Sequence, residues 1–205
     1  MTTPTKRVPV IGIVGGVGAG KSSVTAQFAK LGCTVVDADR IGHALLLDPP
    51  IRDAIRKRFG EIVINRAGRV NRQRLAEQVF SDREKLEALN SIVHPELWRR
   101  FRAKVEAAHR RGRGRAIILD AALLMEKELD KLCDLVVYLE VPEEVRRVRA
   151  AEARGWDPSE VSRREATQLS LKLKRERADC VIDNSASPEH TLDQIRAILS
   201  RLMKG

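Results

Sequence analysis

The stretch Gly15-Gly16-Val17-Gly18-Ala19-Gly20-Lys21-Ser22 decides the fold of this chain. It fits the pattern G-x-x-x-x-G-K-[ST], in which a glycine-rich backbone wraps an anion. The apolar run Val10–Val14 precedes it and predicts a buried strand, and the stretch from about Lys21 to Leu31 predicts a helix. The amino end of a helix adds partial positive charge where phosphates would lie. The order of strand, glycine turn and helix therefore predicts a phosphate-binding P-loop.

The parts of this loop have separate predicted roles. Backbone N–H groups from the third glycine onward hold the phosphates, the Lys21 ammonium reaches the outer phosphates, and the Ser22 hydroxyl can ligate magnesium. The residues that would supply those N–H groups are Gly18, Ala19, Gly20, Lys21, Ser22 and Ser23. The sequence therefore predicts a site for the phosphates of a nucleotide together with Mg²⁺.

Length and composition indicate one folded domain. The chain has 205 residues, of which 43% are hydrophobic and 32% charged, as is typical of a globular protein. No apolar run approaches the ~20 residues that cross a bilayer. Lys6-Arg7 followed by the apolar run Val8–Ala19 resembles a signal peptide. Because the P-loop accounts for the same residues, we expect residues 1–7 to be a short tail and the protein to be cytoplasmic.

The formal net charge of +10 indicates acidic partners. Nucleic acid is one such class, and small substrates rich in phosphate are another. Aromatic residues make up only 3% of the chain and are not interleaved with the basic clusters at 52–58, 99–115 and 146–177. Stacking on bases requires aromatic residues among such clusters. We therefore expect phosphate-rich small substrates, with no nucleic acid and no membrane as partners.

The three cysteines, Cys33, Cys133 and Cys180, are odd in number and widely spaced. This pattern fits neither a disulfide framework nor a zinc site. We expect each to be a small hydrophobic residue in the core.

Apolar runs alternate with amphipathic stretches along the chain. This alternation predicts an α/β fold, in which helices cover both faces of a parallel sheet. The predicted strands are Val8–Val14, Thr34–Val36, Ala116–Leu119, Leu135–Leu139 and Val181–Ile182.

The segment from about 40 to 106 contains no convincing buried strand. Ser81 and Glu84 form a predicted capping box, and the turn 65–68 predicts a pair of short edge strands within 61–70. We interpret the segment as a helical substrate-binding insertion, with a purely structural helical cap as the alternative. Its predicted helices are Pro50–Phe59, Asn71–Phe80, Asp82–Ile92 and a longer one that begins at Pro95.

A basic region follows the fourth predicted strand. Pro142–Ala153 predicts a helix, Gly155–Ser159 predicts a break, and Ser159–Arg177 predicts a second basic helix. The arrangement resembles a mobile lid. An arginine that closes over a transferred phosphoryl group would stabilise its charge and exclude water. We expect one or two of Arg146, Arg149, Arg154 and Arg163 to do so, and the others to be solvated.

Acidic residues follow two of the predicted strands, at the sheet edge where ligands bind in open α/β folds. Asp37 and Asp39 follow the second strand, and strand alternation places them on the same side. Either could accept a proton from an attacking hydroxyl or help hold magnesium, or it could only cap a helix. Asp120 ends the third strand and is a candidate magnesium partner, with a helix cap as the alternative.

An ordered series of motifs resembles the dephospho-CoA kinase family from Val10 to Leu202. A P-loop alone is shared by many proteins, whereas the series is specific. Its pieces are the P-loop, Val36-Asp37-Ala38-Asp39, Asn71-Arg72-Gln73-Arg74-Leu75, Val79-Phe80, Leu89-Asn90, His94-Pro95, Asp120 with Leu123-Leu124 and Glu126, Arg163 with Gln168, Ala178-Asp179, and Val181-Ile182-Asp183-Asn184.

The resemblance implies that ATP phosphorylates the ribose 3′-hydroxyl of dephospho-CoA to give CoA. It implies an adenylate-kinase-like P-loop fold with a helical substrate subdomain and a lid. It favours Asp39 over Asp37 as the base and places Asn184 near the adenine of ATP. The residues that it assigns to the acceptor side are Asn71, Arg72, His94 and Asp120.

Two positions depart from the family pattern. The family usually shows Asp-Val-Pro-Leu-Leu where this chain has Asp120-Ala121-Ala122-Leu123-Leu124, and it usually shows glutamine where this chain has Arg146. We expect these departures to affect acceptor contacts more than the kinase chemistry.

The sequence thus predicts one kinase domain that uses ATP and Mg²⁺. Its core covers about 8–39, 113–141 and 178–205, the acceptor-binding insertion about 40–112, and the lid about 142–177. Lys21, Asp39, Arg149 and Arg163 are the catalytic candidates, and a monomer or weak homo-oligomer is expected. The competing functions are another nucleoside or nucleotide kinase, which the same fold could serve, and a P-loop ATPase that binds nucleic acid.

Overall fold

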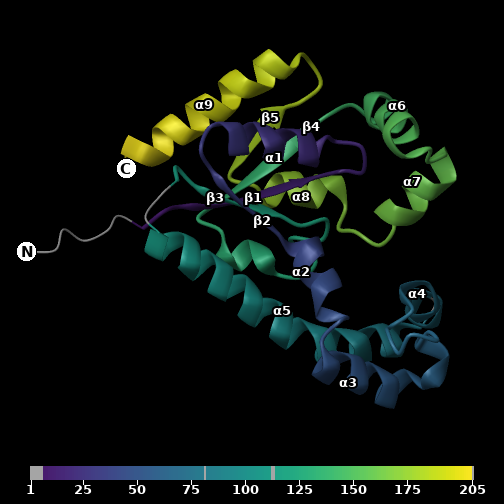
Figure 1. Ribbon diagram of the computed structural model, residues 1–205. Helices are drawn as coiled ribbons and strands as arrows, with labels where there is room; N and C mark the ends of the chain where they lie inside the picture. The colour runs from purple at the N-terminus through teal and green to yellow at the C-terminus, as the bar shows by residue number, and fades with distance from the viewer. Residues whose placement is uncertain (1–6, 81, 112–113, 205) are drawn as a thin grey trace, which may run out of the picture. The chain divides into compact units, whose positions relative to one another are not determined.

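The computed structural model describes residues 7–80, 82–111 and 114–204 (Figure 1), and the side chains of Asp39, Phe80 and Lys204 lie outside the description. The chain forms two compact units. We refer to Met1–Asp37 with Val105–Gly205 as the core unit and to Ala38–Lys104 as the inserted unit. The predicted insertion at about 40–112 overlaps the inserted unit, whereas the predicted lid at 142–177 falls within the core unit.

The core unit is built on a five-stranded parallel sheet with the order β2-β3-β1-β4-β5. The sequence predicted each strand to within two residues at either end. β1 is central and all six of its residues are buried. The strands are β1 (Val10–Gly15), β2 (Thr34–Asp37), β3 (Ile117–Asp120), β4 (Leu135–Glu140) and β5 (Cys180–Asp183).

Two helices, α1 (Lys21–Lys30) and α9 (Pro188–Lys204), cover one face of the sheet (Figure 1). Strand alternation turns Ile11 and Ile13 of β1 toward this face. There they pack in one apolar cluster with Phe28 of α1 and with Ile195 and Leu199 of α9.

The opposite face of the sheet is covered by other parts of the core unit. A Cβ at Gly12 of β1 would lie 2.7 Å from the Cys133 sulfur and 3.0 Å from a Leu124 methyl carbon. The short helix α8 (Leu171–Arg177) packs on β1 and β4. The remaining elements of this unit are the 3-10 helix η2 (Leu129–Leu132), α6 (Glu143–Arg154), α7 (Pro158–Glu165) and the last turns of α5 (Arg83–Arg111).

The inserted unit has its own small core. Ile55 and Val63 are fully buried in it, and its other buried members are Ile64, Val70, Leu75 and Val79. The predicted hairpin at 61–70 reduces to one antiparallel bridge, Ile64 with Val70. The elements of this unit are α2 (Ala38–Leu45), α3 (Pro49–Phe59), the 3-10 helix η1 (Glu61–Val63), α4 (Arg72–Phe80) and most of α5.

The prediction of two helices on either side of His94-Pro95 was wrong, because α5 runs through Pro95 as one helix of 29 residues. Leu89, Val93, Leu97 and Phe101 recur every four residues across the proline, so one side of the helix stays apolar throughout. The Asp82 carboxylate caps α5 by accepting the N–H of Lys85 at 3.0 Å. The predicted cap at Ser81 lies outside the described residues.

The second predicted basic helix, Ser159–Arg177, is divided in the structure. α7 ends at Glu165 and α8 begins at Leu171, where the Ser170 hydroxyl caps the helix by accepting the N–H of Leu173. The two pieces differ in environment, because α8 carries the fully buried Lys174 and packs on the sheet.

Candidate active site

The P-loop joins β1 to α1 with a sharp turn. Gly18 and Gly20 adopt left-handed backbone conformations, with φ of 76° and 81°. Residues other than glycine rarely adopt such conformations. The Ala19 N–H donates to the Gly16 carbonyl at 3.2 Å and closes the turn. The N–H groups of the first turn of a helix have no partner within the helix. The turn therefore brings N–H donors together at the positively polarised end of α1.

The P-loop glycines also admit neighbours that a side chain would exclude. A Cβ at Gly16 would lie 2.5 Å from an Arg146 guanidinium nitrogen, and one at Gly18 would overlap the Arg146 carbonyl. A Cβ at Gly20 would lie 2.5 Å from the Asn184 amide nitrogen. Close packing of α6 and the β5–α9 loop thus favours glycine at all three positions, and the backbone geometry also favours it at Gly18 and Gly20.

Lys21 folds back over the loop that precedes it. Its ammonium group donates to the carbonyl oxygens of Gly15 and Gly16 at 3.0 and 3.1 Å. Burial, and then the positive charge of Lys174, lower the pKa of Lys21 from 10.5 to about 8, although the Asp120 carboxylate opposes the shift. The Lys21 ammonium is therefore held at the P-loop with too little negative charge nearby to offset the effect of its burial on its pKa.

Asn184 braces the P-loop from the end of β5. Its buried amide nitrogen donates to the Ala19 carbonyl at 2.8 Å, and its amide oxygen accepts from the Thr191 hydroxyl at 2.9 Å. Arg149 of α6 donates to the Asn184 backbone carbonyl at 2.8 Å. The structure thus places Asn184 and Arg149 next to the P-loop, where one end of the Asn184 amide holds the loop and the other is held by α9.

Arg146 lies beside the P-loop as well, with its side chain buried. It donates to the Val17 carbonyl at 3.1 Å and forms an ion pair with Glu165 of α7. We expected Arg146, which replaces the glutamine usual in the family, to affect acceptor contacts. Its position gives no support for that effect, because Arg146 contacts the loop that is predicted to bind the nucleotide.

Two carboxylates lie side by side at the carboxyl edge of the sheet. Asp37 ends β2 and is in register with Asp120, which ends β3 and is itself paired with Ile13 of β1. The alternation argument for Asp39 was wrong, because the strand ends at Asp37 and α2 begins at Ala38. The side chain of Asp39 lies outside the described residues.

A buried ion pair that the sequence analysis missed lies near Lys21, since both of its charges act on the pKa of that residue. The Lys174 ammonium lies 2.9 Å from a Glu126 carboxylate oxygen and donates to the Gln168 amide oxygen at 2.7 Å. The same Glu126 oxygen accepts the Leu169 N–H at 2.9 Å. Glu126 and Gln168 were among the motif residues, but no local pattern marked Lys174, which resembles the other lysines of a basic stretch.

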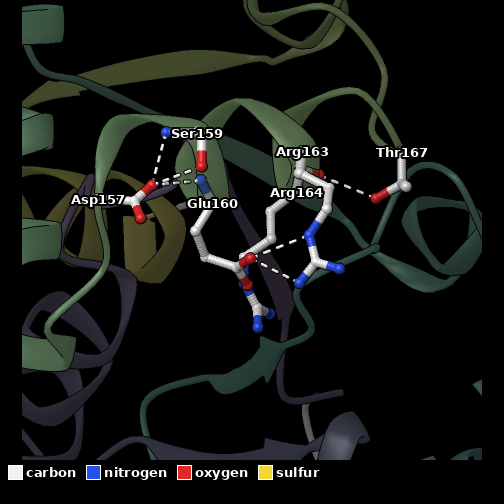
Figure 2. Close-up of polar contacts among 6 residues, drawn as sticks. All are labelled: Asp157, Ser159, Glu160, Arg163, Arg164 and Thr167. Atoms are coloured by element: carbon white, nitrogen blue, oxygen red, sulfur yellow. Dashed lines mark hydrogen bonds and ion pairs between the residues drawn. The ribbon is translucent and has the colours of Figure 1, made fainter.

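The arginines of α7 are engaged with an acidic neighbour (Figure 2). Arg163 donates to Glu160 at 2.9 and 2.5 Å, and Arg164 donates to the other oxygen of the same carboxylate at 2.7 Å. Asp157 caps the helix by accepting the N–H groups of Ser159 and Glu160. Of the two arginines among the catalytic candidates, the structure brings Arg149 next to the P-loop and pairs Arg163 within α7.

Aromatic contacts hold the turn between α6 and α7. The Arg154 and Arg164 guanidinium groups lie 4.7 and 3.9 Å from the centre of the Trp156 ring. Trp156 packs in turn against the small apolar cluster of Val17, Ala150 and Val161. Trp156 therefore stabilises the α6–α7 turn through cation–π contacts with two arginines and through apolar contacts with this cluster.

The predicted acceptor residues belong to the inserted unit, except Asp120. Asn71 caps α4 by accepting the Arg74 N–H at 3.2 Å. Arg72, the first residue of α4, donates to the His43 Nε2 of α2 at 2.7 Å, and that nitrogen accepts because arginine only donates. His94 lies within α5. The sequence analysis missed His43, which is near Asp37-Ala38-Asp39 in sequence but carries no signal of its own.

Two features are absent from the described part of the chain. None of its helices is both long enough and apolar enough to span a membrane. It also contains no group of three or more His, Cys, Asp or Glu side chains arranged to hold a metal ion.

Comparison with known proteins identifies close relatives. A sequence model of dephospho-CoA kinases matches residues 9–190. The dephospho-CoA kinase of Carboxydothermus hydrogenoformans is 37% identical over 195 residues, covering 95% of this chain and 94% of the relative. That of Bacillus licheniformis is 39% identical over 191 residues, covering 93% of this chain and 94% of the relative.

Solved structures confirm the fold. The crystal structure of TT1252 from Thermus thermophilus superposes with a TM-score of 0.84 at 31% identity, covering 96% of this chain and 99% of the other. Dephospho-CoA kinase from Campylobacter jejuni superposes with a TM-score of 0.63 at 18% identity, covering 97% and 100%. Shikimate kinase from Acinetobacter baumannii gives 0.50 at 20% identity, covering 98% of both chains. The predicted P-loop kinase fold is therefore confirmed.

Proposed function

The chain belongs to the dephospho-CoA kinase family, and on that premise we propose roles for its residues in the reaction it catalyses, the ATP-dependent phosphorylation of dephospho-CoA to CoA. The observation that carries the proposal is the geometry of the P-loop. Two left-handed glycines direct the loop into α1, and the Lys21 ammonium lies 3.0 and 3.1 Å from two of its carbonyl oxygens.

The P-loop would bind the ATP phosphates through the N–H groups of Gly18 to Ser23 and through Lys21. A triphosphate placed at the amino end of α1 would receive these N–H donors together with the helix dipole. It would also supply the negative charge that Lys21 lacks in its buried environment. Asn184 would hold the loop in place rather than contact the adenine with its amide, because both ends of that amide are engaged within the protein.

The residues at the P-loop fit a magnesium ion. Ser22 follows Lys21 at the start of α1, and Asp120 lies near enough to the Lys21 ammonium to raise its pKa. A hydroxyl and a carboxylate are hard oxygen ligands, and Mg²⁺ in kinases is held by one or two such groups plus substrate phosphates. Ser22 and Asp120 would hold the ion, which when bound would neutralise charge on the phosphates.

Asp39 would accept the proton of the ribose 3′-hydroxyl and orient its oxygen toward the γ-phosphoryl group. The family motif favours this residue. Asp37 is the alternative, since it ends β2 in register with Asp120 at the ligand-binding edge of the sheet. General-base assistance of this kind contributes roughly 10²–10⁴-fold to a rate.

An arginine would stabilise the charge that spreads over the transferred group. Arg149 is the better placed of the two candidates, because it donates to the backbone of the residue that braces the P-loop. Arg163 would first have to leave Glu160. The lid at about 142–177 would thus contribute through α6 at its P-loop end.

The inserted unit would hold the acceptor. Asn71, Arg72 and His94 are its proposed binding residues, with Asp120 of the core unit. Arg72 is exposed and fixed by His43, as suits a cation that meets a diphosphate. We further propose that the enzyme is cytoplasmic, acts as a monomer or weak homo-oligomer, and has no nucleic-acid partner.

A substrate panel tests the proposed function. Release of ADP is followed in a coupled assay with ATP, Mg²⁺ and either dephospho-CoA or a nucleoside monophosphate as acceptor. Dephospho-CoA should support turnover and the monophosphates should not. Turnover with monophosphates alone would identify a nucleotide kinase instead.

A further inference from the structure

Val17 of the P-loop is held by side chains from α6 and α7, the first two helices of the predicted lid. The Val17 side chain packs with Ala150 of α6 and Val161 of α7 in a small apolar cluster. Its backbone N–H donates to Glu165 Oε1 at 3.2 Å, and its carbonyl oxygen accepts from Arg146 Nη1 at 3.1 Å. Both polar backbone groups of this residue are therefore held by side chains from two other helices.

The two side chains that hold Val17 also hold each other. Arg146 Nη1 donates to the same Glu165 oxygen that accepts the Val17 N–H. The Arg146 side chain is 5% exposed and that of Glu165 is 29% exposed. Among the described residues, the buried Arg146 Nε has no hydrogen-bond partner. One oxygen and one guanidinium nitrogen thus form a closed set of contacts with a single P-loop residue.

Stability alone is a weak reason for this arrangement. Removing two charges from water costs about as much as their attraction returns, so a buried ion pair is often no better than apolar side chains of similar size. The pair does, however, hold both polar groups of the Val17 backbone between Gly16 and Gly18, and glycine has more backbone freedom to lose than any other residue. A preorganised loop binds phosphate without paying the entropy of ordering it first.

We propose that Arg146 and Glu165 are positioning residues that hold the Val17 backbone and thereby set the P-loop for ATP. The proposal rests on the function proposed above, since it concerns the affinity of the same loop for the same nucleotide. The contacts on which it depends run from α6 and α7 to the Val17 backbone.

Three variants separate this role from a merely structural one. Arg146→Leu/Glu165→Leu replaces the pair with apolar side chains, Glu165→Leu removes only the acceptor, and Glu165→Gln keeps an oxygen that can accept the Val17 N–H. Arg147→Leu is the matched control, because Arg147 is exposed on the same helix and pairs with Glu143. The ATP dissociation constant is measured by calorimetry, the KM for dephospho-CoA by steady-state kinetics, and unfolding by thermal melting.

The proposal predicts that the double variant melts near the unsubstituted protein but binds ATP about tenfold more weakly, because two backbone hydrogen bonds have gone. Its KM for dephospho-CoA should not change. Glu165→Gln should restore most of the ATP affinity that Glu165→Leu loses, and Arg147→Leu should alter neither substrate. If the double variant does not fold, the ATP affinities of Glu165→Gln and Glu165→Leu still test the proposed positioning role.

Unchanged ATP affinity in the leucine variants would overturn the inference, as would equal losses in Glu165→Gln and Glu165→Leu. A weakening that affects dephospho-CoA as much as ATP would also contradict it, since that is the sign of general damage. If the unsubstituted protein binds no ATP at all, the proposed function itself fails, which the first titration of the series reveals separately.

Discussion

At the scale of single residues, Lys21 connects the electrostatics of the P-loop to nucleotide binding. Burial lowers its pKa from 10.5 to about 8, so above that pH much of the nucleotide-free protein carries a neutral Lys21. A triphosphate beside the amine favours its charged form and raises the pKa again. ATP binding near pH 8.5 should therefore take up a proton, and ATP affinity should fall as the pH rises through 8.

The proton uptake is measured by calorimetry of ATP binding in buffers that differ in ionisation enthalpy. Lys21→Arg is the matched control, because a guanidinium keeps its charge at this pH and should abolish the buffer dependence. Equal buffer dependence in both proteins would assign the proton to another group.

Asp39 carries a second prediction at this scale. Asp39→Asn should lower kcat by about 10²–10⁴-fold, as expected for loss of a general base, with ATP affinity nearly unchanged. Asp37→Asn is the comparison, since the neighbouring carboxylate is the alternative base. Steady-state kinetics and ATP titration on both variants decide between them. A large rate loss only in Asp37→Asn would transfer the role, and a joint collapse of rate and ATP affinity in Asp39→Asn would indicate a metal or structural role.

At the scale of elements, the sign of the change in stability on replacing Pro95 tests whether α5 is one continuous helix. Proline inside a helix removes a hydrogen bond and costs up to about 3 kcal/mol relative to alanine, whereas proline at the first position of a helix is favourable. Because α5 runs through Pro95, Pro95→Ala should raise the free energy of unfolding by about 1–3 kcal/mol.

Denaturant unfolding measures this change, with the exposed Lys104→Ala on the same helix as the control for a general gain in helix propensity. A decrease in stability for Pro95→Ala would mean that the helix begins at Pro95, as the sequence pattern alone suggested.

The elements also show what the sequence could predict. The five strands and α1 were predictable because their signals are local: apolar runs, a glycine turn, and a helix of regular pattern. The continuity of α5 and the break between α7 and α8 depend on tertiary packing, which overrides the local signals of Pro95 and of a uniformly basic stretch. The alternation argument for Asp39 failed because it was extended past the end of β2.

At the scale of the whole molecule, the motifs fixed the family and the kinase chemistry, while long-range contacts determine how the site is supported. Arg146 and Glu165 are 19 residues apart and meet only when α6 and α7 pack on the P-loop. Lys174 meets Glu126 across a longer gap, of 48 residues. No local pattern marks such pairs, so the pairing of these residues was found only in the structure.

The most direct test of the account is to identify the product formed from ATP and dephospho-CoA in the presence of Mg²⁺. Mass spectrometry should show that dephospho-CoA gains one phosphoryl group, and phosphorus NMR should show a new phosphate monoester on its ribose, with ADP formed in equal amount. Unaltered dephospho-CoA, with or without hydrolysis of ATP to ADP and phosphate, would contradict the claim that this P-loop and the carboxylates at the sheet edge serve phosphoryl transfer to that acceptor.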